Sequence, residues 1–96
     1  MYPIGVHQKI LNRIVWVLRE KGIWVERHSY SFRIMYRERI VGSLHLYPGY
    51  NLIVLKLYSG ELGTSKKLAR IINGVLNNFL PNYSIEIYIE NEKTSL

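Results

Sequence analysis

Residues 30–58, YSFRIMYRERIVGSLHLYPGYNLIVLKLY, decide the fold of this chain. Apolar and polar side chains alternate along residues 30–37 and again along residues 39–47, which is the pattern of half-buried strands. Residues 48–51, PGYN, are a turn sequence, and a β-rich run at residues 52–58 follows it. Because short turns join strands that pair with each other, this stretch predicts an antiparallel β-meander.

A helix and a strand are predicted upstream of the meander. The apolar residues of this helix recur at three- and four-residue spacing, which places them on one face: Ile10, Leu11, Ile14, Val17 and Leu18. Gly22 ends the helix, and residues 23–28 form the strand. Trp16 falls on the polar side of the helix. There it either anchors a partner or second subunit, or is covered by the N-terminal arm at residues 1–5.

A second helix and a last strand are predicted downstream. Thr64 or Ser65 caps the helix, Pro81 ends it, and residues 83–90 alternate as a final strand. Each helix carries one apolar stripe, and both stripes have to be buried against a sheet.

The sequence therefore predicts a single α+β domain over residues 1–96, with a frayed tail at residues 91–96. Its architecture is a two-layer sandwich in the order helix, antiparallel β-meander of three to four strands, helix, strand. Both helices are expected on one sheet face, which leaves the other face exposed.

The composition excludes several kinds of site. The chain has no cysteine and no aspartate, so it has no disulfide framework, no thiolate metal site and no Ser-His-Asp triad. The three histidines lack the tight spacing of metal ligands, and no motif fixes a histidine and a glutamate as an acid–base couple. The candidate couples are His28 with Glu26 and His45 with Glu38. We expect a non-catalytic protein without cofactor, metal or small-molecule substrate.

No apolar run approaches the roughly 20 residues that span a bilayer, and the first residues, MYPIG, lack the basic and apolar regions of a signal peptide. We therefore expect an intracellular protein with no membrane partner. Abundant Ile, Tyr, Lys and Arg, with no Cys and no Asp, are compatible with a microbe of hot environments or its virus.

The net charge of +6 is concentrated in the first 60 residues, which hold nine Lys and Arg against three Glu. The remaining residues hold four of each sign. A surplus concentrated in this way favours a polyanion partner such as DNA or RNA, although such a charge also keeps a small protein soluble.

Cationic and aromatic side chains share the exposed side of the meander if the alternation runs through it unbroken. We predict that this strand face binds the phosphates and bases of a nucleic acid. Its residues are Arg33, Arg37, Arg39, His45, Tyr47, Lys56 and Tyr58. In the alternative that stays open, Glu86 and Glu90 of the last strand pair with these arginines across the sheet.

The start of the second helix, residues 60–67 (GELGTSKK), adds Thr, Ser and two Lys to the unpaired N–H groups of a first helical turn. It is either a phosphate site that uses Lys66, Lys67 and Arg70, or an ordinary capped helix with solvated lysines.

Residues 65–70, SKKLAR, resemble the Ser-Lys-Lys-x-Ala-Lys opening of the second helix in double-stranded-RNA-binding domains, which also run helix, three-strand meander, helix. The resemblance implies that Lys66 and Lys67 meet phosphates across a groove. It covers about six residues. The small residues expected next are replaced by residues 71–73, IIN, and the final strand has no counterpart.

Residues 18–27, LREKGIWVER, are similar to the helix-to-strand passage of archaeal Holliday-junction resolvases and other PD-(D/E)xK nucleases. The core of those enzymes also continues through strands to a helix and a last strand, and residues 44–59 would correspond to their catalytic hairpin. Ser43, Lys56 and Tyr58 stand where the family has Asp, Glu and Lys. Without two acidic ligands a Mg²⁺ is not held to activate water, so the resemblance implies a nuclease-like fold that binds without cutting.

These observations predict a small basic protein that contacts the backbone of DNA or RNA through its strand face and the Lys-rich helix start. The alternative is a homodimeric protein-interaction module, an adaptor or inhibitor, with no nucleic-acid role. Trp16 and Gly74 are the candidates for a partner interface, because a glycine on the polar side of the second helix indicates a close backbone approach.

Overall fold

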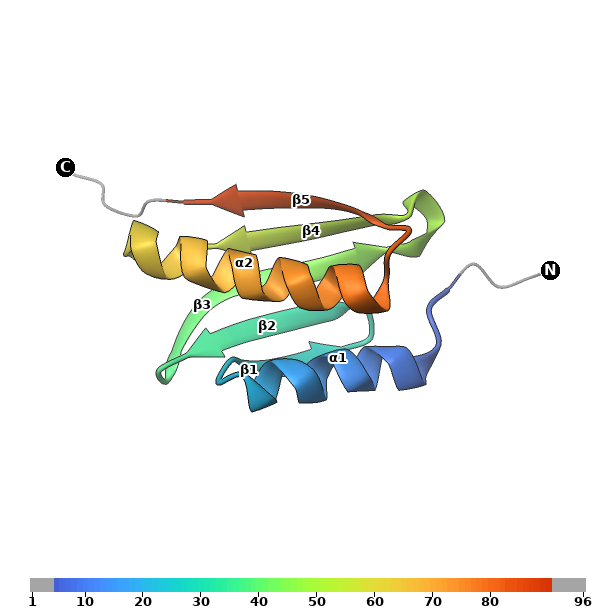
Figure 1. Cartoon of the computed structure of the whole chain (residues 1–96), viewed down its shortest axis with the longest axis horizontal. Coiled ribbons are helices and arrows are strands. Elements are labelled where there is room, and N and C mark those ends of the chain that lie inside the picture. Colours follow the sequence, from blue (N-terminus) through green and yellow to red (C-terminus); the bar gives the residue numbers. More distant parts are fainter. Residues whose placement is uncertain (1–4, 91–96) are drawn as a thin grey trace.

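A computed structural model describes residues 5–90 of the chain, and the predicted order of elements is confirmed (Figure 1). In chain order, the elements are α1 (Gln8–Glu20), β1 (Trp24–His28), β2 (Ser31–Tyr36), β3 (Arg39–Tyr47), a 3-10 turn (Pro48–Tyr50), β4 (Leu52–Leu57), α2 (Leu62–Phe79) and β5 (Ser84–Ile89). The strands begin and end within two residues of the predicted limits.

The five strands form one sheet in the order β1-β2-β3-β4-β5. The first four strands are an antiparallel meander. β5 runs parallel to β4 because α2 returns the chain to the end of the sheet at which β4 begins. Both helices lie on the same face of the sheet and run in opposite directions (Figure 1). The predicted two-layer α+β sandwich is therefore confirmed, and neither of the described helices covers the second face of the sheet, the open sheet face.

The core lies between the helices and the sheet. From the helices it takes the predicted apolar stripes, including Leu11, Ile14 and Leu18 of α1. From the sheet it takes side chains that share a row across neighbouring strands, because antiparallel partners point to the same side. Phe32, Leu44 and Leu55 form one such row.

A β-bulge interrupts the alternation in β3. The pairing with β2 shifts between Ile34 and Met35, so that one extra residue of β3 is accommodated near Val41. As a result, Val41 is buried with 4% of its surface exposed, and Ile40 is 51% exposed on the open face. Unbroken alternation had placed these two side chains the other way round, and that expectation is wrong.

Gly42, which follows the bulge, allows β3 and β4 to approach closely. A Cβ at this position would collide with the carbonyl oxygen of Lys56 and would lie 2.8 Å from Cδ2 of Leu57. Only glycine fits without a shift of the neighbouring strand.

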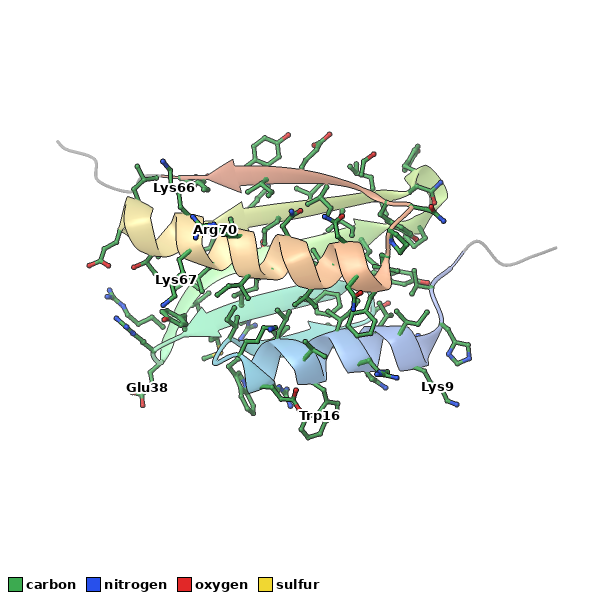
Figure 2. All side chains as sticks on the ribbon, in the orientation of Figure 1. Lys9, Trp16, Glu38, Lys66, Lys67 and Arg70 are labelled. Atoms are coloured by element: carbon green, nitrogen blue, oxygen red, sulfur yellow. The ribbon has the colours of Figure 1, made fainter. Side chains whose placement is uncertain are left out.

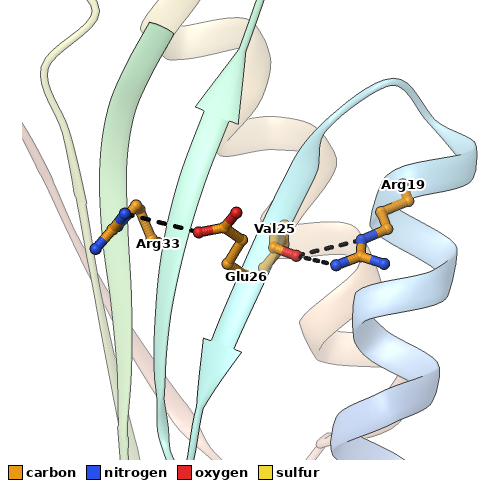
Figure 3. Close-up of polar contacts among 4 residues, drawn as sticks. All are labelled: Arg19, Val25, Glu26 and Arg33. Carbon is orange, nitrogen blue, oxygen red and sulfur yellow. Dashed lines mark hydrogen bonds and ion pairs between the residues drawn. The ribbon is translucent and has the colours of Figure 1, made fainter. Parts of the chain in front are cut away.

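Arg19 joins α1 to the outer edge of the sheet. Its Nε and Nη2 donate hydrogen bonds of 3.2 and 2.8 Å to the carbonyl oxygen of Val25 (Figure 3). Its guanidinium also stacks 3.9 Å from the centroid of the Trp24 ring. The side chain thus occupies a backbone acceptor of the edge strand β1.

α2 begins earlier than predicted, at Leu62, and Glu61 takes the cap position. Neither Thr64 nor Ser65 caps it. The Thr64 hydroxyl donates to Oε1 of Glu61 at 2.8 Å, and the buried Ser65 hydroxyl bonds with that of Ser59 at 2.7 Å. Both hydroxyls therefore fix the loop before α2.

Candidate nucleic-acid interface

The charge of the molecule is divided unequally between its two faces. The helices and their caps carry seven cations against two glutamates, namely Lys9, Arg13, Arg19, Lys21, Lys66, Lys67 and Arg70 against Glu20 and Glu61. We call this surface the helix layer. The side chains of Lys9, Lys66, Lys67 and Arg70 project from it into solvent (Figure 2). The surplus of positive charge thus lies on the helices.

The open sheet face carries two cations against three glutamates. Its charged residues are Glu26, Arg33, Lys56, Glu86 and Glu90, which the strand registers place on one side. His45, Tyr47 and Tyr58 lie on this face as predicted. Because carboxylates outnumber the cations here, the expectation of a basic strand face is wrong.

Arg33 forms a salt bridge with a neighbour that the sequence interpretation did not consider. Its Nη1 lies 3.6 Å from Oε1 of Glu26 on the adjacent strand β1 (Figure 3). Glu86 and Glu90 were the alternative partners, but Glu86 lies on β5 and Glu90 directly follows it, with β3 and β4 between them and Arg33. That alternative is wrong as well.

Aromatic and polar side chains of the open sheet face contact one another. Nδ1 of His45 lies 2.6 Å from the hydroxyl oxygen of Ser31, and the ring centroids of His45 and Tyr47 are 4.5 Å apart. The Tyr88 hydroxyl donates to Oε1 of Glu86 at 2.9 Å, and this hydrogen bond raises the pKa of Tyr88 above its ordinary value.

Arg37 and Arg39 lie at the end of the sheet and not on its open face. Arg37 and Glu38 form the two-residue turn between β2 and β3, each with positive φ. Arg39 pairs with Tyr36, whose side chain packs against the core on the helix side. The turn and the bulge therefore move both guanidinium groups away from Arg33.

These two arginines instead approach the start of α2. Nζ of Lys67 lies 3.4 Å from the Tyr36 hydroxyl, and the guanidinium of Arg37 lies 5.1 Å from the centroid of the Tyr36 ring. Arg39 lines the same shallow hollow as residues 59–61 and Thr64. We call Tyr36, Arg37, Arg39 and Lys67 the hairpin corner, and it extends the cationic surface of the helix layer.

A groove runs between the two helices. Its cationic lining residues are Arg13, Lys21 and Arg70, and its apolar ones are Val17, Ile71, Val75 and Phe79. The Arg13 guanidinium lies 5.7 Å from the centroid of the Phe79 ring. Among residues 5–90 no carboxylate lines this interhelical groove, so none of the described residues opposes its positive charge there.

Gly74 lies in this groove and is exposed. A Cβ there would meet no atom within 4 Å, so the close backbone approach expected at Gly74 is not made by the described residues of this chain. Trp16 is 63% exposed on α1 (Figure 2). Of the arm that was its alternative cover, only Gly5 lies within the described range.

The helix-layer cations lie farther than 4 Å from any carboxylate in the part of the chain that the structure describes. Over residues 5–90, the pair of Arg33 and Glu26 is the only salt bridge within that distance. Cations without a bound carboxylate keep their attraction for an external anion.

Arg13 and Lys21 are the residues that the sequence interpretation missed. With Val17 they stand at positions i, i+4 and i+8 along α1 and its C-cap, which is one stripe along a helix. That spacing was a usable signal. What the sequence could not supply was the position of α2 beside this stripe.

The histidines take separate places. Nδ1 of His7 accepts a hydrogen bond from the backbone N–H of Lys9 and caps α1, and His28 ends β1. His45 follows Glu38 by seven residues, and the part of β3 between Arg39 and His45 alone spans about 20 Å in an extended strand. No group of three potential metal-ligating side chains occurs within residues 5–90.

Among the helices described here, none is both long and apolar enough to cross a membrane. Comparison of the chain with family models, with curated proteins and with solved structures finds no match.

Proposed function

We propose that this protein is an intracellular, non-catalytic nucleic-acid-binding protein that contacts the phosphate backbone of DNA or RNA through its helix layer. The observation that carries the proposal is the separation of charge, with unpaired cations gathered over α1 and α2 and a slight excess of carboxylates on the open sheet face. The residues assigned to the interface are Arg13, Lys21, Lys66, Lys67 and Arg70, with Arg37 and Arg39 at its edge.

Both helices contribute cationic side chains to the interhelical groove. Arg13 and Lys21 are eight residues apart, which is about 12 Å along α1, and Arg70 faces them from α2. Lysine and arginine side chains at such spacings can meet successive phosphates, and release of counterions then drives binding. Contacts of this kind carry no base specificity, so we expect general affinity for nucleic acids.

The resemblance of residues 65–70 to double-stranded-RNA-binding domains supports the assignment of Lys66 and Lys67, because both side chains are exposed at the start of α2. The chain departs from that family in having four meander strands and a fifth strand after α2.

The nuclease-like resemblance is compatible with binding alone. Ser43 and Lys56 are register partners on the open sheet face, so the positions that would hold the metal bear a hydroxyl and an ammonium group. This arrangement offers no pair of carboxylates for Mg²⁺.

Fluorescence anisotropy with a labelled duplex and a labelled single strand tests the proposal at several salt concentrations. Three double variants each remove two positive charges: K66A/K67A, R13A/K21A and, as the matched control on the open sheet face, R33A/K56A. If about six phosphates are engaged on duplex DNA, the slope of log binding constant against log salt concentration is about −5 for the wild type. Each helix-layer variant should make this slope less steep by about two. The control should bind as the wild type does.

Equal loss of affinity in all three variants would mean that only net charge matters. Absence of wild-type binding at low salt would remove the proposed function.

The alternative function is a protein-interaction module, and one observation favours it. The open sheet face is uncovered and exposes large apolar side chains, including Trp24, Ile40, Tyr47 and Tyr88. If the anisotropy titration shows no binding, this face becomes the leading candidate for function.

A further inference from the structure

We infer that the edge strand β5 pairs antiparallel with β5 of a second copy of this chain. The resulting dimer would have one continuous sheet of ten strands, five from each copy. The inference rests on the backbone of β5 and is independent of the proposed nucleic-acid binding.

The outer edge of β5 presents unpaired backbone groups. The N–H of Ser84 donates to the carbonyl of Asn51, and the N–H of Glu90 donates to the carbonyl of Leu57, each at 2.8 Å. Since alternate residues of a strand point their backbone groups to opposite sides, those of Ile85, Ile87 and Ile89 face away from β4. No other part of residues 5–90 bonds to them.

The opposite edge of the sheet is treated differently. At β1, Arg19 donates two hydrogen bonds to the carbonyl oxygen of Val25, and the N–H of Ile23 donates to the carbonyl of Leu18 at 3.0 Å. Proteins commonly block exposed edges in this way to prevent unwanted pairing. Here one outward carbonyl of β1 is occupied by a side chain, whereas nothing within residues 5–90 bonds to the outer edge of β5.

Among the registers centred on residues 86, 87 and 88, which overlap most of β5, the charges favour one. When Ile87 faces Ile87 of the second copy, Ile85 faces Ile89, Glu86 faces Tyr88 and Ser84 faces Glu90. Centring the pair on Glu86 would place two carboxylates opposite each other, and centring it on Tyr88 would place Glu86 opposite Glu90. Like charges directly opposite destabilise a strand pair, so the Ile87-centred register is favoured.

The same register gives both an apolar contact and a full set of hydrogen bonds. The three isoleucines have outward-facing backbone groups, so the pairs that they form are the hydrogen-bonded ones. Their side chains share the helix side of the sheet, where Ile87 is 39% exposed beyond the cover of α2. The second copy would bury that surface.

The symmetry also fixes where the helices go. Antiparallel strands of one sheet are related by a two-fold axis perpendicular to it, so both helix layers would lie on the same side of the dimer. The dimer would therefore present two cationic helix layers side by side.

A cysteine cross-link tests the register directly, because the natural chain has no cysteine. In the Ile87-centred pair the two Cα atoms of residue 87 are about 5.5 Å apart, within the range that a disulfide spans. The two Cα atoms of residue 85 are about 14 Å apart, which is too far. Under mild oxidation we expect I87C to give a covalent dimer of twice the 11.3 kDa chain mass, and I85C, its matched control, to stay uncrosslinked.

Light scattering of the unmodified protein and of two lysine variants completes the test. The wild type and I40K, which changes an exposed residue of the open sheet face, should be dimers, and I87K should be a monomer with unchanged circular dichroism. A monomeric wild type at about millimolar concentration, or a dimer that I40K disrupts and I87K does not, would overturn the inference. Equal cross-linking of I85C and I87C would overturn the register.

Discussion

Arg33 and Glu26 face each other across β2 and β1, with Nη1 and Oε1 3.6 Å apart on the open sheet face. Arg33, which alternation correctly placed on the exposed side of the meander, therefore has a carboxylate of the neighbouring strand beside it. The contact also shows why cations cannot be assigned to a site by strand position alone: the neighbour that pairs with a charge comes from another strand.

The Arg33–Glu26 pair should contribute little to stability. Both side chains are more than half exposed, so solvent screens their attraction. A double-mutant cycle with R33Q and E26Q, measured by urea denaturation, should give a coupling free energy of about 0–1 kcal/mol. A clearly larger coupling would mean that the pair is held more rigidly than an exposed salt bridge.

Replacement of Arg19 should destabilise the fold. R19M keeps the apolar stem but loses both hydrogen bonds to the Val25 carbonyl and the contact with Trp24. We expect the free energy of unfolding to fall by about 1–3 kcal/mol, with a change in tryptophan fluorescence. K9M, on the exposed side of the same helix, is the control and should change stability by less than about 0.5 kcal/mol.

Gly42 and Gly74 should respond in opposite directions to alanine. In G42A the new methyl group meets the Lys56 carbonyl and Leu57, so the free energy of unfolding should fall by about 1–3 kcal/mol. In G74A the methyl group meets open space on a helix, where alanine is better than glycine by about 1 kcal/mol. A stabilising G42A would contradict the close approach of β3 and β4.

Glu86 should control the ionisation of Tyr88. The neutral phenol donates to the Glu86 carboxylate, whose negative charge also opposes formation of a phenolate, and both effects raise the pKa of Tyr88. In E86Q that pKa should move down towards the ordinary tyrosine value near 10. The tyrosinate absorbance of E86Q minus wild type, followed from neutral to alkaline pH, checks this. An unchanged titration curve would show that the hydrogen bond is not formed in solution.

The layers of the fold could be predicted from the sequence because the spacing of apolar residues within each helix and strand indicates which of its sides is buried. Leu11, Ile14 and Leu18 mark the buried side of α1, and the row containing Phe32 and Leu44 marks the buried side of the meander. Such patterns are local, so one chain is enough to interpret them.

The position of the cations could not be predicted by the same means. Counting alternate residues from Arg33 through Arg37 to Arg39 passes through a turn with two positive φ angles and then meets the bulge at Val41. Each of these changes the side to which the next residue points. A register shift depends on how two strands pair, so the sequence of one strand alone does not predict it.

The interhelical groove escaped prediction for a related reason. Arg13 lies on α1 and Lys21 caps its C-terminus, but only the packing of α2 against the same sheet face brings Arg70 opposite them. Sites formed between elements depend on topology as well as on composition.

Amide chemical-shift mapping during titration with a short duplex tests the central claim most directly, because it locates the interface without any substitution. We predict perturbations at Arg13, Lys21, Lys67 and Gly74, on the two helices, while Ser43, His45 and Lys56 on the open sheet face stay unchanged. Perturbations confined to those three strand residues, with no chemical-shift change in α1 or α2, would contradict the assignment of binding to the helix layer.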